Sequence, residues 1–319
     1  MPDDAWQLLR LMDGFVTTQL LYVAAKLGVA EALTEPKTAA ALADELHVDA
    51  DALTRVLRGL ALEDVVSEDE GTFALTALGA HLPALKGPAL VRGELYFHGA
   101  EGLLDAVKHG GTAFERIYDA PFFTHLDQYP SHEAAFEASM AGRAEQEAQA
   151  VVAAYDFTLL KTLVDVGGGR GVLLNAILRQ APHLDATLFD RPAAIEAARP
   201  HVPKVVAGDF FEAVPPGADA YLLSRVLHDW DDEDALRILA TVRRAMREAG
   251  RVLIVDAILP RHARDKPAAI RMDLHMLLLL GARERTEAEF RALLERAGFH
   301  HITVHPTDSP AGLSVMDAR

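Results

Sequence analysis

The sequence contains no cysteine among its 319 residues. That absence excludes disulfide bonds, thiolate metal sites and a cysteine nucleophile. Long hydrophobic runs are also missing: the longest fully apolar segment is 276–282, whereas a membrane-spanning helix needs about 20 such residues. The first ten residues lack the pattern of a signal peptide. We therefore expect a cytoplasmic protein that does not enter a membrane.

Basic residues are few, since 31 Lys and Arg stand against 47 Asp and Glu and leave a net charge of −16. A chain this acidic repels phosphate backbones and anionic lipid surfaces, which argues against nucleic acid or membrane as its main partner. Apolar residues, in contrast, make up 50% of the chain. A second core or an oligomer interface accommodates that much apolar surface, and the length favours two domains.

The two halves of the chain differ in pattern. Residues 1–155 are rich in Ala and Leu, whereas from residue 162 short apolar runs alternate with helical segments. Continuous apolar strands between helices are typical of a parallel sheet that is covered on both faces. The last two runs predict a hairpin that adds one antiparallel strand. The expected strands are 162–166, 186–190, 204–209, 220–226, 251–258, 301–305 and 313–317.

The N-terminal half divides again. Apolar positions at helical spacing over 5–33 predict a helix that either forms a dimer interface or packs within its own subunit. Residues 38–82 continue with helix, turn, helix and a short hairpin, which is typical of a winged helix. Its nine acidic residues against two arginines give a net charge of −7, which excludes DNA binding. We expect a structural or dimerising winged helix.

A glycine-rich loop, 165–171 (DVGGGRG), lies between a predicted strand and a predicted helix. Glycines at 167, 169 and 171 let the backbone turn sharply and approach a ligand closely. The dinucleotide fingerprint needs Gly or Ala at the position of Val172, which argues against an NAD enzyme. The spacing suits S-adenosylmethionine (SAM), whose ammonium group the Asp165 carboxylate would balance. A tight turn without a ligand is the alternative.

Two further acidic positions fit the same ligand. Asp190 ends the second strand, where a carboxylate accepts both hydrogen bonds of a ribose diol. Asp209 and Phe210 follow the third strand, where they suit the amino group and the ring face of adenine. Each also has a structural interpretation: Asp190 as a solvated acid or helix cap, and Asp209 with Phe210 as a capping acid beside a core phenylalanine.

His228 follows the fourth strand, at the edge where open α/β sheets bind ligands. With a pKa of about 6.5, histidine is a suitable general base for a phenol. A structural histidine bonded within its loop is the alternative.

A base histidine needs a carboxylate to orient it. The candidates are Asp256, which is expected to end the fifth strand, and Glu284. Taken alone, Glu284 is a solvated residue before a helix, because Thr286 and Glu289 form a good capping box.

Together these segments resemble one family, the SAM-dependent O-methyltransferases of the caffeate, hydroxyindole and anthracycline type. The matching pieces, in family order, are DVGGGRG, LFDRP, GDFF, LHDWDDEDALRIL and GARERTEAEF. The stretch GFVTTQLLYVAAKLGVAEAL and the winged helix resemble the family's dimerisation domain. The likeness covers essentially the whole chain.

The resemblance implies an α/β class I methyltransferase (Rossmann-like) domain with a seven-stranded sheet, preceded by a mainly α winged-helix dimerisation domain. The expected segments are a dimerisation domain (1–90), a helical linker with substrate-pocket residues (91–155) and the SAM-binding domain (156–319). Together with the loop analysis, it gives SAM contacts at Asp165, Gly167, Gly169, Asp190, Asp209, Phe210 and Ser224. The catalytic residues would be His228 as base with Asp256 and Glu284 flanking it. The expected aromatic-substrate contacts are Met140, Trp230 and Met276, although a Met on a helix is as often core.

The implied reaction is methyl transfer from SAM to a hydroxyl, in a homodimer that needs no metal. Its acceptor would be an aromatic small molecule or secondary metabolite. Two alternatives keep the fold: N-methylation, and chemistry that retains SAM without transferring its methyl group. A third is a non-catalytic winged-helix protein that senses a ligand.

Overall fold

The computed structural model describes residues 3–319, apart from the side-chain environment of positions 3, 142, 193 and 197. The chain divides into two compact units, each described by itself below. Unit 1 comprises Met1–Glu101 and Arg116–Gly142, and unit 2 comprises Gly102–Glu115 and Arg143–Arg319. The three-segment division expected from the sequence stays a prediction.

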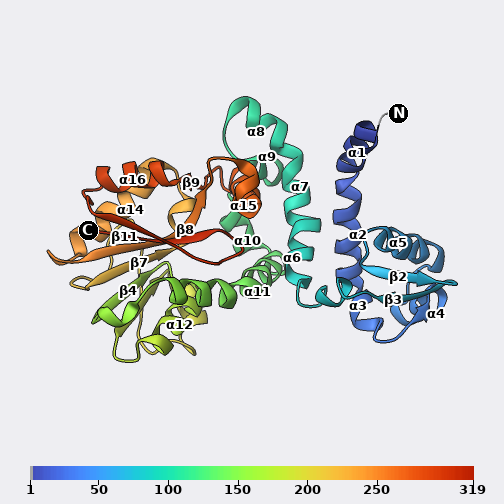
Figure 1. Ribbon diagram of the computed structural model, residues 1–319, viewed down its shortest axis with the longest axis horizontal. Helices are drawn as coiled ribbons and strands as arrows, with labels where there is room; N and C mark the ends of the chain where they lie inside the picture. Colours follow the sequence, from blue (N-terminus) through green and yellow to red (C-terminus); the bar gives the residue numbers. More distant parts are fainter. Residues whose placement is uncertain (1–2) are drawn as a thin grey trace. The chain divides into compact units, whose positions relative to one another are not determined.

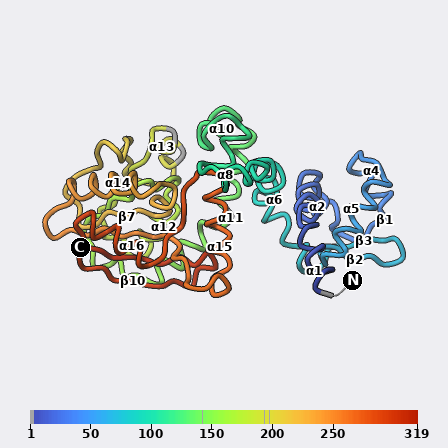
Figure 2. Tube along the Cα trace, turned by 90° about the horizontal axis from the view of Figure 1, so that it is seen from above, coloured from blue at the N-terminus to red at the C-terminus, as the bar shows by residue number. Residues whose placement is uncertain are grey.

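The N-terminal part of unit 1 contains the expected winged helix. The helix expected over 5–33 is instead broken at Asp13 and at Gly28, where the backbone is left-handed (φ 75°), a conformation that suits glycine. A third short strand, β1, joins the predicted hairpin. Figure 2 shows these elements gathered at the blue end of the chain. They are α1 (Asp3–Met12), α2 (Gly14–Leu27), α3 (Val29–Ala32), β1 (Lys37–Thr38), α4 (Ala39–Leu46), α5 (Ala50–Leu62), β2 (Val66–Asp69) and β3 (Thr72–Leu75).

The first helical segment differs in burial along its length. In α2, Ala24 and Ala25 are buried in a core that includes Leu57 and Phe73. In α1 and at the start of α2, Leu11 and the neighbouring apolar side chains are exposed. The later part therefore packs within its own unit, and the earlier part presents an apolar surface.

Further helices follow the winged helix. A single π-helical stretch, η2 (Arg92–Tyr96), lies between α6 and α7. The chain crosses between the units at three points, within η3 (Ala100–Gly102), within α9 and within α11. These helices are α6 (Lys86–Val91), α7 (Phe97–Gly99), α8 (Leu103–His109), α9 (Ala113–Tyr118), α10 (Phe122–Gln128) and α11 (Pro130–Ala154).

Unit 2 is built on a mixed sheet with the strand order β10-β11-β8-β7-β4-β5-β6. Strands β4 to β8 are parallel, and β11 runs antiparallel between β8 and β10, as the terminal hairpin predicted. A short extra strand, β9, pairs with the end of β8 and brings the sheet to eight strands. The strands are β4 (Thr162–Val166), β5 (Asp185–Asp190), β6 (Val205–Ala207), β7 (Ala220–Ser224), β8 (Arg251–Leu259), β9 (Arg285–Thr286), β10 (Ile302–Pro306) and β11 (Leu313–Ala318).

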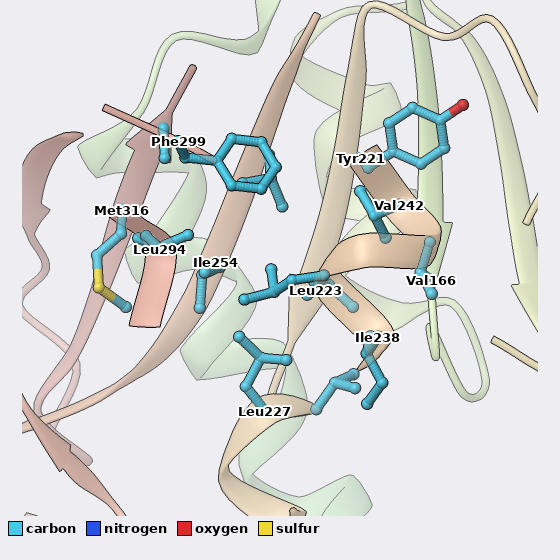
Figure 3. Packing of buried hydrophobic residues seen from close by; sticks show 14 of the residues in the cluster. Val166, Tyr221, Leu223, Leu227, Ile238, Val242, Ile254, Leu294, Phe299 and Met316 are labelled. Atoms are coloured by element: carbon cyan, nitrogen blue, oxygen red, sulfur yellow. The ribbon is translucent and has the colours of Figure 1, made fainter. Parts of the chain in front are cut away.

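Helices cover both faces of this sheet, with α14 and α16 on one face and α12 on the other (Figure 1). Figure 3 shows the first core, in which Leu223 and Ile254 from neighbouring strands pack with Ile238 and Leu294 from the helices. This two-sided burial explains why the central strands are continuously apolar. The helices are α12 (Val172–Gln180), α13 (Pro192–Ala198), α14 (Asp232–Ala245), α15 (Pro267–Leu279) and α16 (Glu287–Arg296).

Candidate active site

The glycine loop leaves β4 at the carboxyl edge of the sheet and leads into α12. Gly167, Gly169 and Gly171 all have positive φ, at 73°, 56° and 77°. A Cβ on Gly171 would lie 2.4 Å from Val202, so this position excludes a side chain on packing as well as on φ. A Cβ on Gly169 would meet no protein atom within 4 Å. The loop is therefore tightly packed below and open at Gly169.

Asp190 lies beside this loop, at the end of β5. Its Oδ2 accepts the backbone N–H of Gly169 at 2.8 Å, and its Oδ1 accepts the N–H of Arg191 at 2.6 Å. Each carboxylate oxygen can accept a second hydrogen bond. Asp190 thus ties the loop to β5 and keeps acceptor capacity for a ligand.

Asp165 lies within β4, directly below the loop, and is 1% exposed. Its Oδ1 is buried without a hydrogen-bond partner among the described residues. Burial, with the nearby Asp190 carboxylate adding to it, raises the pKa of Asp165 to about 7. The structure places this carboxyl under the loop, and its contact with a ligand stays a prediction.

The next two strands bring the remaining predicted SAM contacts to the same edge. Asp209 follows β6, and its Oδ1 accepts the N–H of Phe211 at 2.8 Å. Phe210 packs edge to face against Phe211 and against Trp230, with centroids 5.0 Å and 5.9 Å apart. Ser224 is the last residue of β7. The capping and packing contacts explain Asp209 and Phe210 structurally, and their ligand contacts remain predictions.

His228 lies in the turn η5 (Leu227–Asp229) after β7 and is 4% exposed. Its Nδ1 lies 2.8 Å from Oε1 of Glu284, and its Nε2 lies 3.3 Å from Oδ1 of Asp229. Burial disfavours the imidazolium, but the Asp229 and Glu284 carboxylates outweigh it and raise the pKa of His228 to about 9. The ring is therefore held between two carboxylates that favour its protonated form.

Glu284 is not the solvated residue that its sequence context alone predicts, because it is 1% exposed. Its backbone N–H donates to Oδ1 of Asp273 at 2.9 Å. The expected capping box of Thr286 and Glu289 is present at the start of α16. The capping box and the burial of Glu284 therefore coexist. The contact with His228, which lies far away in the sequence, accounts for the burial of Glu284.

Asp256 lies inside β8 rather than at its end, because the strand continues past it: β11 pairs as far as Ala257, and β9 pairs with the last two residues of β8. It is fully buried, and neither carboxylate oxygen has a hydrogen-bond partner among the described residues. Burial raises the pKa of Asp256 to about 7, with His228 opposing that rise and Glu284 adding to it. The structure brings Asp256 into the electrostatic neighbourhood of His228 without a hydrogen bond between them.

Three charged residues of this site were not anticipated from the sequence. Asp229 contacts Nε2 of His228, and the fully buried Arg285 bonds to the turn around it. Arg225 has a positive φ of 55° and a buried Nη1 for which the described residues supply no hydrogen-bond partner. Each is adjacent in sequence to a residue predicted for the site: Arg225 to Ser224, Asp229 to His228, and Arg285 to Glu284. A charged residue directly beside a predicted site residue was the sequence feature that could have indicated them.

The predicted substrate contacts belong to different elements of the fold. Trp230 packs against Phe211 with ring centroids 4.8 Å apart, and Met276 is buried in a small cluster with Met272. Met140 lies in α11, in the part that belongs to unit 1. Contact of these residues with a substrate stays a prediction.

Metal-binding clusters and membrane-spanning helices are both absent from residues 3–319. Within that range, no group of three or more His, Cys, Asp or Glu side chains has a geometry that holds a metal ion. In the same part of the chain, no helix has the length and apolar character needed to cross a membrane.

Comparisons with known proteins cover the chain nearly end to end. Residues 9–83 match the O-methyltransferase dimerisation domain, and residues 101–300 match the O-methyltransferase domain. The chain is 41% identical to phenazine O-methyltransferase PhzM of Lysobacter antibioticus, with 98% of this chain and 95% of the relative covered.

Two other relatives bear on the reaction. The O-methyltransferase NcsB1 of neocarzinostatin biosynthesis was solved with SAM and 2-hydroxy-5-methyl naphthoic acid. It superposes with a TM-score of 0.83 at 31% identity over 95% of both chains. Aclacinomycin 10-hydroxylase RdmB of Streptomyces purpurascens is 36% identical, with 97% of this chain and 89% of the relative covered. The chain is thus similar both to methyltransferases and to a hydroxylase.

Proposed function

This chain belongs to the SAM-dependent O-methyltransferase family, and on that premise we propose that it methylates a phenolic hydroxyl of an aromatic small molecule with His228 as general base. The observation that carries the proposal is the His228–Glu284 pair. Because Glu284 holds Nδ1 at 2.8 Å, the other ring nitrogen, Nε2, is the one that takes the hydroxyl proton.

The residues at the carboxyl edge of the sheet fit SAM. The loop is open at Gly169, where no protein atom would meet a Cβ within 4 Å, and Asp190 beside it keeps acceptor capacity for a ribose. We propose that Gly167, Asp209, Phe210 and Ser224 complete the contacts and that Asp165 shapes the loop from below. When bound, SAM supplies an activated methyl group.

The base must shed its proton before it acts. In the structure Asp229 lies 3.3 Å from Nε2, the position that the substrate hydroxyl needs. We propose that the imidazolium first releases its Nε2 proton to solvent, that the hydroxyl displaces Asp229 as it binds, and that the hydroxyl then passes its own proton to the free Nε2. Glu284 stabilises the resulting imidazolium, and Asp256 attracts it in its ionised form. The transfer itself depends on holding oxygen and methyl in line.

The phenazine and naphthoic acid relatives support an aromatic acceptor for this chain. We propose that Trp230, Met276 and Met140 contact its ring, since Met and aromatic side chains suit a flat apolar surface. The dimerisation domain supports a homodimer.

A second candidate function is non-methylating chemistry on the same fold, and the similarity to aclacinomycin 10-hydroxylase favours it. The intact His228–Glu284 pair favours methyl transfer, because a base is needed to activate a hydroxyl nucleophile.

Titration calorimetry with SAM and S-adenosylhomocysteine, followed by turnover assays, tests the proposal. We expect one site per chain for both compounds. Methylation is then followed with 2-hydroxy-5-methyl naphthoic acid and a panel of hydroxylated phenazines and naphthoic acids, by mass gain and by S-adenosylhomocysteine release. Binding of SAM with an oxygenated but unmethylated product would move the hydroxylase candidate to first place. Absence of binding would remove the assignment of the glycine loop.

A further inference from the structure

We propose that Arg285 is a positioning residue that holds the turn carrying His228 through its backbone; the proposal rests on the function proposed above for His228. In the structure Arg285 is 0% exposed, an unusual position for an arginine. Its neighbour Glu284 holds the ring of His228. Two consecutive residues thus contact the same short turn in different ways.

The guanidinium of Arg285 spans the turn from end to end. Its Nη1 donates to the carbonyl oxygen of Leu227 at 2.7 Å, and its Nη2 donates to that of Trp230 at 2.9 Å. His228 and Asp229 lie between these two carbonyls. Because the guanidinium is planar and rigid, it fixes the separation and orientation of both ends of the turn.

The charge of Arg285 is balanced by Asp232, whose Oδ1 also lies 2.8 Å from Nη2. Its Nε donates to Oδ1 of Asp232 at 2.9 Å, and its guanidinium lies 6.0 Å from the ring centroid of Phe290. Asp232 opens α14, so the same contact anchors the start of that helix. All three nitrogens of the buried guanidinium therefore have a partner, as a desolvated charge requires.

The backbone of Arg285 is itself fixed. Arg285 and Thr286 form β9, which pairs with Ile258 and Leu259 at the end of β8. The sheet therefore holds Glu284 and Arg285, and these hold the ring and the main chain of the His228 turn. The direction of Nε2 follows from both contacts together. We infer that loosening the main chain would misalign Nε2 even with Glu284 in place.

Arg285→Lys tests this, with Arg283→Lys as the matched control. Lys keeps the charge but offers one donor atom in place of the fork. Arg283 also pairs with Asp232, at 3.5 Å, but its side chain is 46% exposed and it contacts no carbonyl of the turn among the described interactions. We expect Arg285→Lys to lower kcat by about 10- to 100-fold, the scale of a small misplacement, with the Kd for SAM nearly unchanged. Arg283→Lys should leave both unchanged.

A double-mutant cycle with His228→Ala distinguishes an effect of Arg285 that acts through His228 from an effect on the structure as a whole. If Arg285 acts through His228, Arg285→Lys should lower the residual turnover of His228→Ala by less than about twofold. An equal loss in both backgrounds, or an unchanged kcat in the single variant, overturns the proposal. Full turnover of His228→Ala would instead remove the base assignment, so the two failures are distinguishable.

A measurement on the substrate-free enzyme needs no acceptor. Titration of the His228 ring by nitrogen-15 NMR should give a lower pKa in Arg285→Lys than in wild type, because the contacts to Glu284 and Asp229 loosen, and an unchanged pKa in Arg283→Lys. An unchanged pKa in both overturns the proposal. If Arg285→Lys does not fold, Asp232→Asn, which weakens the same anchor from a 45% exposed side chain, takes its place with the same expected direction.

Discussion

At the scale of single residues, the site is a set of buried charges with one histidine at its centre. His228 lies between Glu284 and Asp229, and Asp256 and Arg225 contribute to its electrostatic surroundings. Burial alone would lower the pKa of a histidine, so the carboxylates decide its protonation state. Both the loss of the ring and the loss of a carboxylate should therefore change the reaction in a measurable way.

His228→Ala should remove the base and leave the SAM site intact. We expect turnover to fall by about 10²- to 10⁴-fold, the usual contribution of a general base. The affinity for SAM, measured by calorimetry, should change little, because the glycine loop and Asp190 belong to other strand ends. Undiminished turnover would mean that proximity alone drives the reaction.

The pH dependence of the free enzyme should report the Asp229 contact. A base acts in its neutral form, and the raised pKa of His228, about 9, keeps it protonated below that pH. We therefore expect kcat/KM to rise with pH through the neutral range and to level off near that value. Asp229→Asn removes the charge beside Nε2, so the pKa should fall toward its ordinary value and the rise should move to lower pH. A rise that stays in place in this variant would show that Asp229 does not set the pKa.

At the scale of elements, the glycines of the loop are required for different structural reasons. Gly171 is constrained by packing against Val202, whereas Gly169 is constrained by its φ alone. Gly217 matches Gly169 in both respects, since its φ is positive and an added Cβ would meet no atom within 4 Å, but it lies before β7, at the amino edge of the sheet.

This pair of glycines gives a controlled test of the loop. Gly169→Ala and Gly217→Ala should each lose roughly 1 kcal/mol of unfolding free energy, the cost of a left-handed alanine. Only Gly169→Ala should weaken SAM binding, by about tenfold or more, or about 1.4 kcal/mol. Urea unfolding and calorimetry measure the two effects. Equal SAM affinity in both variants would place the cofactor away from Gly169.

At the scale of the whole molecule, the first two helices of unit 1 present apolar side chains that the unit's own core leaves exposed. Trp6, Leu11 and Phe15 are 60%, 67% and 57% exposed on the first two helices. Exposed apolar surface of this kind is typical of an interface. Since residues 9–83 match a dimerisation domain, we expect a second copy of the chain to cover it.

Leu11→Asp should therefore shift the protein from dimer toward monomer, because it places a charge in that surface. Light scattering should give twice the 34.6 kDa of one chain for the wild type and a lower mass for the variant. Leu62→Asp is the control, since Leu62 is 86% exposed at the end of α5 and should leave the mass unchanged. A wild-type monomer, or a variant that remains dimeric, would exclude this surface as the interface.

The sequence by itself determined the order and type of most elements. Period and apolar runs placed the strands and the winged helix because burial on one face or two leaves a direct pattern in the residues. The acidic charge ruled against DNA binding for the same segment, and the glycine spacing with Val172 argued against a dinucleotide site. The capping box at Thr286 was predictable too, because its contacts span three residues.

Tertiary structure alone decided how deeply the charged residues are buried and which groups they contact. Glu284 looks solvated in sequence, yet it bonds to His228, 56 residues away. Asp256 was expected at a strand end, and pairing with β11 and β9 places it inside the strand. Arg285 is an ordinary surface type that the fold buries completely. Local patterns record backbone periodicity and burial, whereas the partner of a charge depends on segments that meet only when the sheet forms.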